Sequence, residues 1–339
     1  DLAFDVSIDG KNHKVSIAEL KLLRLINEYD YYGTMYYQPL ISDDSKPSYE
    51  KLLSKASLID PEKTYLELLA SRGIKIGDME RFNTRLLPTV NPDTKLLQDA
   101  KKAPGGHGQL GMLLLLDAFN SDIAEDGNSY IRSFFNGDGT NNMPNKIIVG
   151  WMKKNNIPVV MVTTTKTGID KKGGQIGVEI LPSGKKIPQI LELAQVPKDQ
   201  VDLFLAMGLT EGSAHSQYFN TNIALINYGA LTPLLKDLAD IIGEDGVKAI
   251  ITPTLIPNTK KTEGEQELRY VQLDSALASA LLNLNAYFVK HSDNPGIQAL
   301  LDQHGINKVL QIVNTSEHER TEFFTPVKES FDYWFQNYS

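Results

Sequence analysis

A glycine-rich stretch followed at once by an apolar run constrains the fold of this chain more than any other feature. The stretch is Pro104–Gly111 (PGGHGQLG), and the apolar run is Met112–Leu116. Glycine accepts positive φ angles and lets another group approach the main chain closely. The pattern therefore predicts a tight loop that leads into a buried helix.

Two interpretations of this loop are open. Backbone N–H groups at the N-terminus of a helix suit a phosphate or the edge of a flat base, and His107 is the only titratable side chain in the loop. The alternative is a helix cap whose histidine faces solvent. Because glycine-rich fragments are weak signals on their own, the choice depends on the motifs downstream.

The composition limits the classes of function. The chain has 339 residues, no cysteine and a net charge of −8. A chain without cysteine has no disulfides and no thiolate chemistry, and it fits a reducing compartment, so we expect a cytoplasmic protein. The negative charge argues against a nucleic-acid partner, and no segment is long and apolar enough to cross a membrane. We therefore expect small-molecule partners.

Predicted strands and helices alternate after the glycine loop. The apolar segment Pro158–Thr164 is typical of a buried strand, and it follows an amphipathic helix over Lys146–Lys153. This alternation predicts an α/β domain with a largely parallel sheet. No internal repeat and no linker is visible, so we expect one domain over residues 1–339, with a small C-terminal lobe over residues 290–339 as the alternative.

Several further elements are predicted by periodicity and turn signals. They are a hairpin whose first strand is Phe4–Ile8, a helix over Ser16–Tyr29, strands over Tyr130–Phe135, Tyr218–Ile226 and Ala249–Thr252, a charged loop over Thr259–Glu267, and a helix over Leu273–Tyr287 with Asp274 in its first turn.

One candidate site follows the predicted strand Tyr130–Phe135, which runs into Asn136-Gly137-Asp138. Ligands of α/β sheets bind at the carboxyl ends of strands, where a carboxylate can hold a metal ion or a ribose. The alternative is a plain turn rich in Asn and Asp.

A cluster of cations forms the second candidate site. Lys166, Lys171 and Lys172 lie around the turn Gly173-Gly174. In an acidic protein such a cluster can hold phosphates, and the alternative is a solvated hairpin.

Polar residues inside apolar stretches form the third candidate site. Glu192 is either a surface residue of an amphipathic element or an acceptor for ligand hydroxyls. Asn220 and Asn222 flank Thr221 at the start of a strand, and amides can read sugar hydroxyls because they both donate and accept hydrogen bonds.

Seven motifs, taken in order, resemble those of the UDP-glucose pyrophosphorylase family, the UTP–sugar-1-phosphate uridylyltransferases. Each motif alone is weak, but their shared order is specific, and residues 1 to 100 match only loosely. The motifs are Gly106-His107-Gly108, Asn136-Gly137-Asp138, Lys166-Thr167 with Asp170, Lys172, Gly173 and Gly174, Leu191 to Pro197 (LELAQVP), Phe219-Asn220-Thr221-Asn222, Gln272-Leu273-Asp274 and Pro326-Val327-Lys328.

The resemblance implies a Rossmann-like nucleotide-sugar transferase fold with a central mixed, mostly parallel sheet. It also implies a reaction of UTP with a sugar 1-phosphate, glucose 1-phosphate foremost, that yields UDP-glucose and pyrophosphate with Mg²⁺ as cofactor. Positioning and charge neutralisation carry such transfers. The implied catalytic residues are Lys328, Lys172 and Asp138, with Asp138 at the metal. The implied substrate-binding residues are Gly106, His107, Gly108, Asn136, Gly173, Gly174, Glu192, Asn220, Thr221 and Asn222.

The sequence also departs from the family pattern. The family's Gly-Gly-x-Gly-Thr triphosphate loop does not occur in this chain, Asp274 stands where the family has Glu, and Phe82-Asn83-Thr84 replaces a uracil-reading Phe-Asn-Gln. We expect this chain alone to be incomplete for catalysis. The family's β-helical C-terminal domain is also missing, and we expect a monomer or a weak oligomer.

Two other functions stay open. A nucleotide-sugar-binding module or inactive relative would keep the sugar motifs without turnover. A glycosyltransferase of similar fold would need an Asp-x-Asp metal motif, of which Asn136-Gly137-Asp138 offers only half, so this alternative ranks last.

Overall fold

The structure is a computed structural model, and its chain divides into two compact units. The first comprises Asp1–Thr84, Phe135–Lys146 and Glu319–Ser339, and the second comprises Arg85–Phe134 and Ile147–His318. The residues that the structure describes are 3–28, 35–39, 41, 45–77, 86–104, 106–121, 130–137, 139, 145–167, 170, 173–192, 196, 198–200, 202, 218–261, 269–316 and 319–327.

The first unit begins with a β-hairpin, as the sequence predicts. Strands β1 and β2 pair antiparallel through Asp9 and Gly10, which both have positive φ angles. Helix α1 follows, and Ser16 Oγ accepts a hydrogen bond from the Glu19 backbone N–H at its start. The elements of this unit are β1 (Phe4–Ile8), β2 (Lys11–Val15), α1 (Ile17–Glu28), β3 (Met35–Tyr37), α2 (Lys46–Leu53), α3 (Tyr65–Ser71), β4 (Ile74–Ile76) and α12 (Arg320–Phe323).

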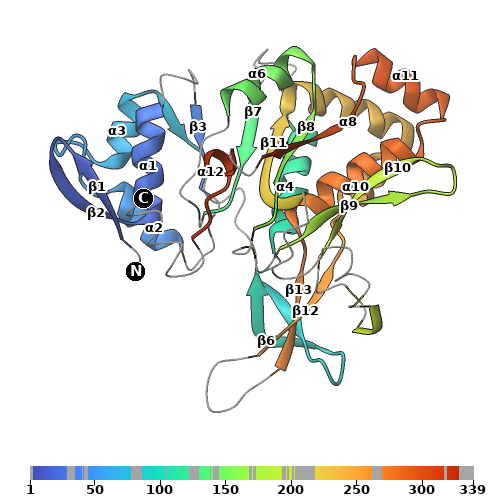
Figure 1. Ribbon diagram of the computed structural model, residues 1–339, viewed down its shortest axis with the longest axis horizontal. Coiled ribbons are helices and arrows are strands. Elements are labelled where there is room, and N and C mark those ends of the chain that lie inside the picture. The colour runs from blue at the N-terminus through green and yellow to red at the C-terminus, as the bar shows by residue number, and fades with distance from the viewer. Residues whose placement is uncertain are drawn as a thin grey trace. The chain divides into compact units, whose positions relative to one another are not determined.

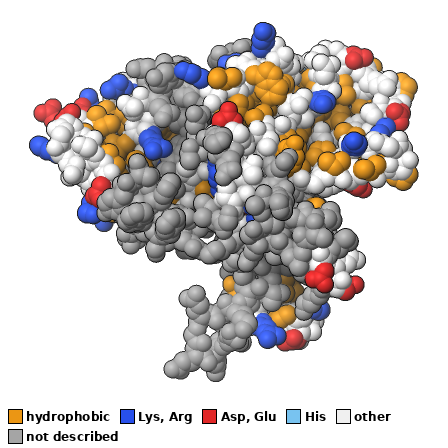
Figure 2. Space-filling view, in the orientation of Figure 1, with side chains coloured by type: hydrophobic (Ala, Val, Ile, Leu, Met, Phe, Trp, Pro, Cys, Tyr) orange, Lys and Arg blue, Asp and Glu red, His pale blue; other side chains and the backbone are white. Residues whose placement is uncertain are grey.

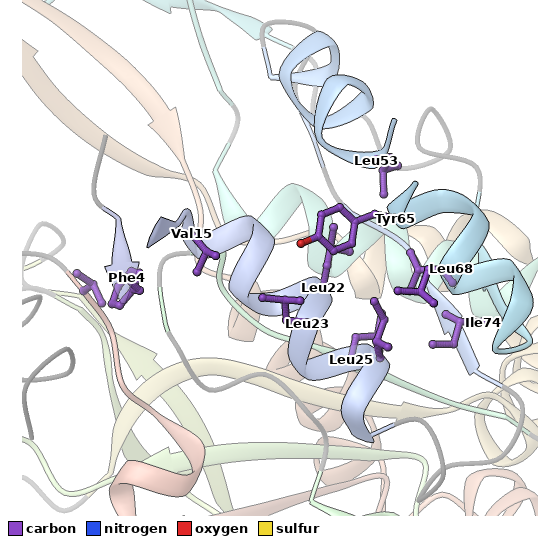
Figure 3. Close-up of a cluster of buried hydrophobic side chains, with 12 residues drawn as sticks. Phe4, Val15, Leu22, Leu23, Leu25, Leu53, Tyr65, Leu68 and Ile74 are labelled. Carbon is purple, nitrogen blue, oxygen red and sulfur yellow. The ribbon is translucent and has the colours of Figure 1, made fainter. Parts of the chain in front are cut away.

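The hydrophobic core of the first unit lies between α1, α2 and α3 (Figure 3). Leu22 of α1 and Tyr65 of α3 are fully buried in it. The Tyr65 hydroxyl donates to Glu19 Oε1 at 2.8 Å, and Lys55 Nζ lies 2.8 Å from the same oxygen. These contacts fix the orientation of α1, because the buried Glu19 carboxylate is matched by a donor and a cation.

The second unit is built around a mixed sheet with the strand order β10-β9-β11-β8-β14, and β7 also pairs with β11. Every residue of β8 is buried. Helix α4 packs against α8 and α10 beside this sheet (Figure 1). The strands are β7 (Ile131–Phe134), β8 (Val159–Thr164), β9 (Gln175–Ile180), β10 (Lys186–Leu191), β11 (Phe219–Asn227) and β14 (Leu310–Thr315).

The expectation of a mostly parallel sheet is not confirmed. Among the described strand pairs of this sheet, β8 and β14 pair in parallel and the other pairs are antiparallel. One reason is local, since a short turn joins β9 to β10 as a hairpin and forces the two strands into opposite directions. The other is that β11 runs against β7, β8 and β9.

A second, smaller sheet of antiparallel strands lies in the same unit, with the order β12-β13-β5-β6 (Figure 1). Its strand β6 leads toward the glycine loop and α4. Its strands are β5 (Leu86–Val90), β6 (Leu97–Pro104), β12 (Ile256–Lys261) and β13 (Arg269–Asp274). The helical segments of the unit are α4 (His107–Phe119), α6 (Lys146–Lys154), η3 (Lys198–Gln200), α8 (Tyr228–Ile242), α9 (Glu244–Ile251), α10 (Leu277–Lys290) and α11 (Pro295–Gln303).

Three predicted elements are wrong. Residues 249–251 continue helix α9 rather than forming a strand, and residues 259–261 belong to β12 rather than to a loop. Asp274 ends β13, and helix α10 begins only at Leu277. None of the described helices is both long and apolar enough to span a membrane.

Candidate functional site

The glycine loop packs closely on the junction between β13 and α10. Gly106 caps α4 with φ +76°, and a Cβ atom there would overlap Asp274 Oδ1. A Cβ atom on Gly108 would overlap the Ser275 side chain, and the Gly108 N–H donates to Ser275 O at 2.7 Å. Both glycines are therefore required by the approach of a neighbouring segment.

The same contacts hold Asp274 beside the start of α4. The Ser275 N–H donates to Asp274 Oδ1 at 2.8 Å, which fixes the carboxylate. His107, the first residue of α4, is exposed. Because the Gly108 N–H is bonded within the protein, it is not offered to a phosphate, and the predicted role of His107 stays a prediction.

Glu192 lies directly after β10, and it is brought close to the Gly-Gly segment and to Asp274. A Cβ atom on Gly174 would overlap Glu192 Oε1. Burial, and secondly the negative charge of Asp274, raise the pKa of Glu192 to about 7. Two carboxylates from different elements therefore share one electrostatic environment next to the glycine loop.

The Gly-Gly segment is packed against the start of β11. Gly173 has φ +138°, and a Cβ atom there would lie 2.6 Å from Cζ of Phe219. The Asn220 N–H donates to Gly174 O at 2.9 Å. Glu192, Gly174 and Asn220, which are far apart in sequence, therefore lie beside one another in the second unit, and their predicted contacts with substrate stay predictions.

A β-bulge shapes the Asn220–Asn222 motif. The pairing register with β8 shifts between Asn220 and Ile223, and Asn222 has φ +57°. Asn220 Nδ2 donates to Asn222 Oδ1 at 2.9 Å, and the Asn222 N–H donates back to Asn220 Oδ1 at 3.2 Å. The two amides are thus oriented by each other.

Thr221 has a structural contact that its sequence context does not predict. Its side chain is 1% exposed, and Oγ1 donates to Val162 O at 2.6 Å while accepting from the Ile223 N–H. The hydroxyl therefore holds the bulge. Its predicted contact with substrate stays a prediction.

The carboxyl end of β8 carries the Lys-Thr motif. Lys166 is buried, and Asp170 Oδ2 accepts hydrogen bonds from the Thr167 N–H at 2.8 Å and from Thr167 Oγ1 at 3.0 Å. Asp170 therefore closes a tight turn after the strand. Lys172, the predicted phosphate contact, lies outside the described residues.

Two buried polar atoms beside these motifs have no hydrogen-bond partner among the described residues. They are Gln109 Oε1 in the first turn of α4 and Thr164 Oγ1 at the end of β8. Buried polar atoms are normally bonded, so both are candidate ligand contacts that sequence reasoning missed. In the sequence, Gln109 is marked only by its place inside the glycine loop. Nothing in the sequence marks Thr164, because it has the character of an ordinary strand residue.

The Asn136 motif belongs to the first unit. Gly139, the residue after this motif, forms an isolated antiparallel bridge with Pro326, the first residue of the predicted Pro326-Val327-Lys328 motif. Asn136 Oδ1 is buried, and within the described chain it has no hydrogen-bond partner. Asp138 and Lys328 lie outside the described residues, and their roles stay predictions.

The donor chemistry at Asn136 fits Mg²⁺, which prefers oxygen ligands. The buried amide oxygen of Asn136 is such a donor. Over the described ranges, no group of three or more His, Asp or Glu side chains could hold a metal by itself. A metal at Asn136 would need further ligands, and Mg²⁺ commonly takes some of its ligands from substrate phosphates.

Known proteins resemble this chain in sequence and in fold. A family model described as UTP–glucose-1-phosphate uridylyltransferase matches residues 63–329. The UTP–glucose-1-phosphate uridylyltransferase 2 of Dictyostelium discoideum is 30% identical over 145 residues, which are 43% of this chain and 26% of the relative.

Two solved structures share the fold. One is a mutant of the UDP-glucose pyrophosphorylase of Leishmania major in complex with UDP-glucose, with a TM-score of 0.59, 17% identity, and coverage of 97% of this chain and 60% of that one. The other, named UDP-glucose phosphorylase, is from Trypanosoma brucei, with a TM-score of 0.58, 18% identity, and coverage of 97% and 60%.

The chain therefore spans about a quarter of the length of the curated relative and three fifths of the solved ones. The family match covers most of the chain and includes every motif from the glycine loop to Lys328. This chain belongs to the UTP–glucose-1-phosphate uridylyltransferase family.

Proposed function

We propose that the protein transfers a uridylyl group from UTP to glucose 1-phosphate, giving UDP-glucose and pyrophosphate. A phosphate oxygen of the sugar phosphate attacks the α-phosphorus of UTP, a new P–O bond forms, and the bond to the leaving pyrophosphate breaks. The observation that carries the proposal is the meeting of Glu192, Gly174 and Asn220 beside one another in a member of this family.

The residues of the second unit are suited to hold the sugar. A buried site that bonds to hydroxyls discriminates against molecules that lack them, because its own polar groups are then left unpaired. We assign this work to Glu192, Asn220 and Asn222. The solved relative from Leishmania major binds UDP-glucose, which supports the choice of sugar nucleotide.

The phosphates need cations in a chain of net charge −8. We assign the phosphates to Lys172 and Lys328, the metal to Asp138, and a contact with the nucleotide sugar to Asn136. When bound, Mg²⁺ would supply positive charge to the phosphate oxygens. Lys172 and Lys328 would neutralise the charge that develops on the leaving pyrophosphate, which is where such transfers gain most of their rate.

Further parts of the proposal concern the fold and the setting of the protein. We propose a Rossmann-like nucleotide-binding domain, a cytoplasmic location, a monomer or weak oligomer, and neither a nucleic acid nor a membrane as partner. On the face shown in Figure 2, the basic side chains of the described residues are scattered among acidic and neutral ones. The described residues of that face therefore form no continuous basic surface of the kind that a polyanion binds.

Binding and turnover should be measured together on the purified chain. Titration calorimetry with UDP-glucose and with GDP-mannose reports binding, and UTP release from UDP-glucose and pyrophosphate reports turnover. Specific UDP-glucose binding with turnover supports the proposal. Because this chain alone is expected to be incomplete for catalysis, turnover should be measured also on a chain extended by the family's Gly-Gly-x-Gly-Thr loop. Binding without turnover in the extended chain would support a nucleotide-sugar-binding module instead, and the absence of both would contradict the two functions.

A further inference from the structure

Lys21 is buried, although lysine is rarely buried unless its charge is matched. It lies on α1 and is 7% exposed. Its Nζ donates to Asn136 O at 3.3 Å and lies 4.9 Å from the centre of the Phe135 ring. The amine therefore contacts two consecutive residues, the aromatic face of Phe135 and the backbone carbonyl of Asn136.

Helix α1, which carries Lys21, is itself held in place by contacts on both sides of this residue. The side chain that follows Lys21, Leu22, is fully buried in the core of the first unit (Figure 3). Two residues before Lys21, Glu19 is held by Tyr65 and Lys55. The backbone of α1 is thus fixed just before and just after Lys21.

The residues that Lys21 contacts open the Asn136 motif. The backbone of this motif is also held farther along, where Gly139 pairs with Pro326. Asn136, whose backbone Lys21 holds, has a buried Oδ1 without a hydrogen-bond partner in the described part of the chain. A residue whose backbone is already held can present this oxygen to a ligand without being ordered anew, which lowers the entropy cost of binding.

We propose that Lys21 is a positioning residue that sets the backbone at Phe135 and Asn136 so that the Asn136 side chain meets the nucleotide sugar. This role deepens the proposed function and rests on it. Lys21 acts through Asn136 and does not itself touch substrate. The motifs of the sequence do not include Lys21, which reads there as a solvated lysine of an amphipathic helix.

Three variants test the role. Lys21→Met keeps the length and the apolar stem but removes the donor and the charge. Lys21→Arg keeps a cation that can donate to a carbonyl and stack on an aromatic ring. Lys51→Met removes an exposed lysine from α2 of the same unit and serves as the matched control.

Two readouts are needed. Titration with UDP-glucose and Mg²⁺ should show affinity about tenfold weaker in Lys21→Met, restored to within about threefold in Lys21→Arg and unchanged in Lys51→Met. Hydrogen exchange should be about tenfold faster at the Asn136 and Gly137 amides of Lys21→Met, while the α1 amides keep their protection.

The outcomes separate this role from a merely structural one. Lost protection along the whole of α1 would mean that Lys21 only supports the core. Unchanged exchange at Asn136 together with unchanged affinity would overturn the proposal. If the wild-type chain binds no UDP-glucose, the proposed function fails, but the exchange measurement still decides whether Lys21 fixes the segment.

Discussion

At the scale of single residues, the pKa of Glu192 is the property most directly determined by its surroundings. Its carboxyl group is held near Gly174 and faces the charge of Asp274, and its pKa is raised from 4.5 to about 7. The folded chain therefore binds this proton more tightly than the unfolded chain does. A carboxyl group that is partly protonated near neutral pH can donate a hydrogen bond as well as accept one.

Linkage gives the sign of the effect on stability. Between pH 4.5 and about 7 the folded state carries more protons than the unfolded state, so the free energy of unfolding falls as pH rises through this window. We expect a contribution of about 1–3 kcal/mol, at about 1.4 kcal/mol per pKa unit. Glu192→Gln should remove it, since the amide does not titrate.

Urea unfolding at pH 5 and pH 8 measures this contribution. Glu244→Gln, which changes an exposed carboxylate on α9, is the control and should keep the wild-type pH dependence. If Glu192→Gln also keeps it, Glu192 is not the group that titrates in this window.

Glycine 106 offers a second test at the same scale. Gly106 and Gly184 have nearly the same positive φ, but a Cβ atom on Gly106 would overlap Asp274 whereas one on Gly184 meets open space. Alanine at either position costs about 1–3 kcal/mol of backbone strain. Gly106→Ala should cost about 1–3 kcal/mol more, because Asp274 must also move. If urea unfolding shows equal losses in the free energy of unfolding for the two alanine variants, the loop is not tightly packed on β13.

At the scale of elements, the local features followed from the sequence and the long-range ones did not. The hairpin at Asp9-Gly10, the buried strand β8 and the helix after the glycine loop were predicted because turn residues and periodicity determine them locally. The direction of the strands in the sheet depends on partners far away along the chain, as with β8 and β14. Periodicity carries no information about such partners.

The wrong elements have the same origin. Residues 249–252 (AIIT) have the composition of a strand, but the helix that begins at Glu244 runs on to Ile251. Asp274 precedes an alanine- and leucine-rich run, yet its pairing with Ile256 keeps it in β13. For the site, the sequence grouped Glu192 with Asn220 and Asn222 but placed Gly174 in a separate cation site, and the buried lysine on α1 had no sequence signal.

An ion pair between a buried aspartate and a partly exposed arginine joins three elements of the second unit. Asp117 of α4 is 8% exposed, its Oδ2 lies 3.0 Å from Arg132 Nη1 of β7, and it accepts a hydrogen bond from the Tyr228 hydroxyl of α8 at 2.9 Å. Arg132→Met should cost about 3–5 kcal/mol, because the Asp117 charge is then left buried without its cation.

The control for this change is Lys248→Met, which breaks exposed ion pairs on α9 and should cost less than about 1 kcal/mol. Urea unfolding measures both. A loss in Arg132→Met as small as in the control would mean that the pair adds little to the packing of α4 against β7.

At the scale of the whole molecule, each unit collects residues from distant parts of the sequence. The second unit brings the glycine loop, Glu192 and the β11 bulge together, and the first brings Lys21, Asn136 and Pro326 together. The proposed function assigns the glucose hydroxyls to the former set, and the latter set contains Asn136, the assigned nucleotide-sugar contact next in the motif to the metal residue Asp138. Ligand binding should therefore change the hydrogen exchange of both units, at different residues in each.

Ligand-dependent hydrogen exchange tests this assignment. UDP-glucose at one hundred times its Kd should raise the free energy of unfolding by about 2.7 kcal/mol, because it binds only the folded chain. Beyond this general rise, protection should increase at the amides of Gly174 and Asn222, which flank the assigned sugar contacts. Glucose 1-phosphate alone should protect the same amides without needing Mg²⁺, since the sugar contacts come from side chains of the second unit.

The amides of Val178 and Ile180, on exposed positions of β9, serve as internal controls. Protection that appears equally at these controls, or that spares Gly174 and Asn222, would move the sugar site away from the β11 bulge.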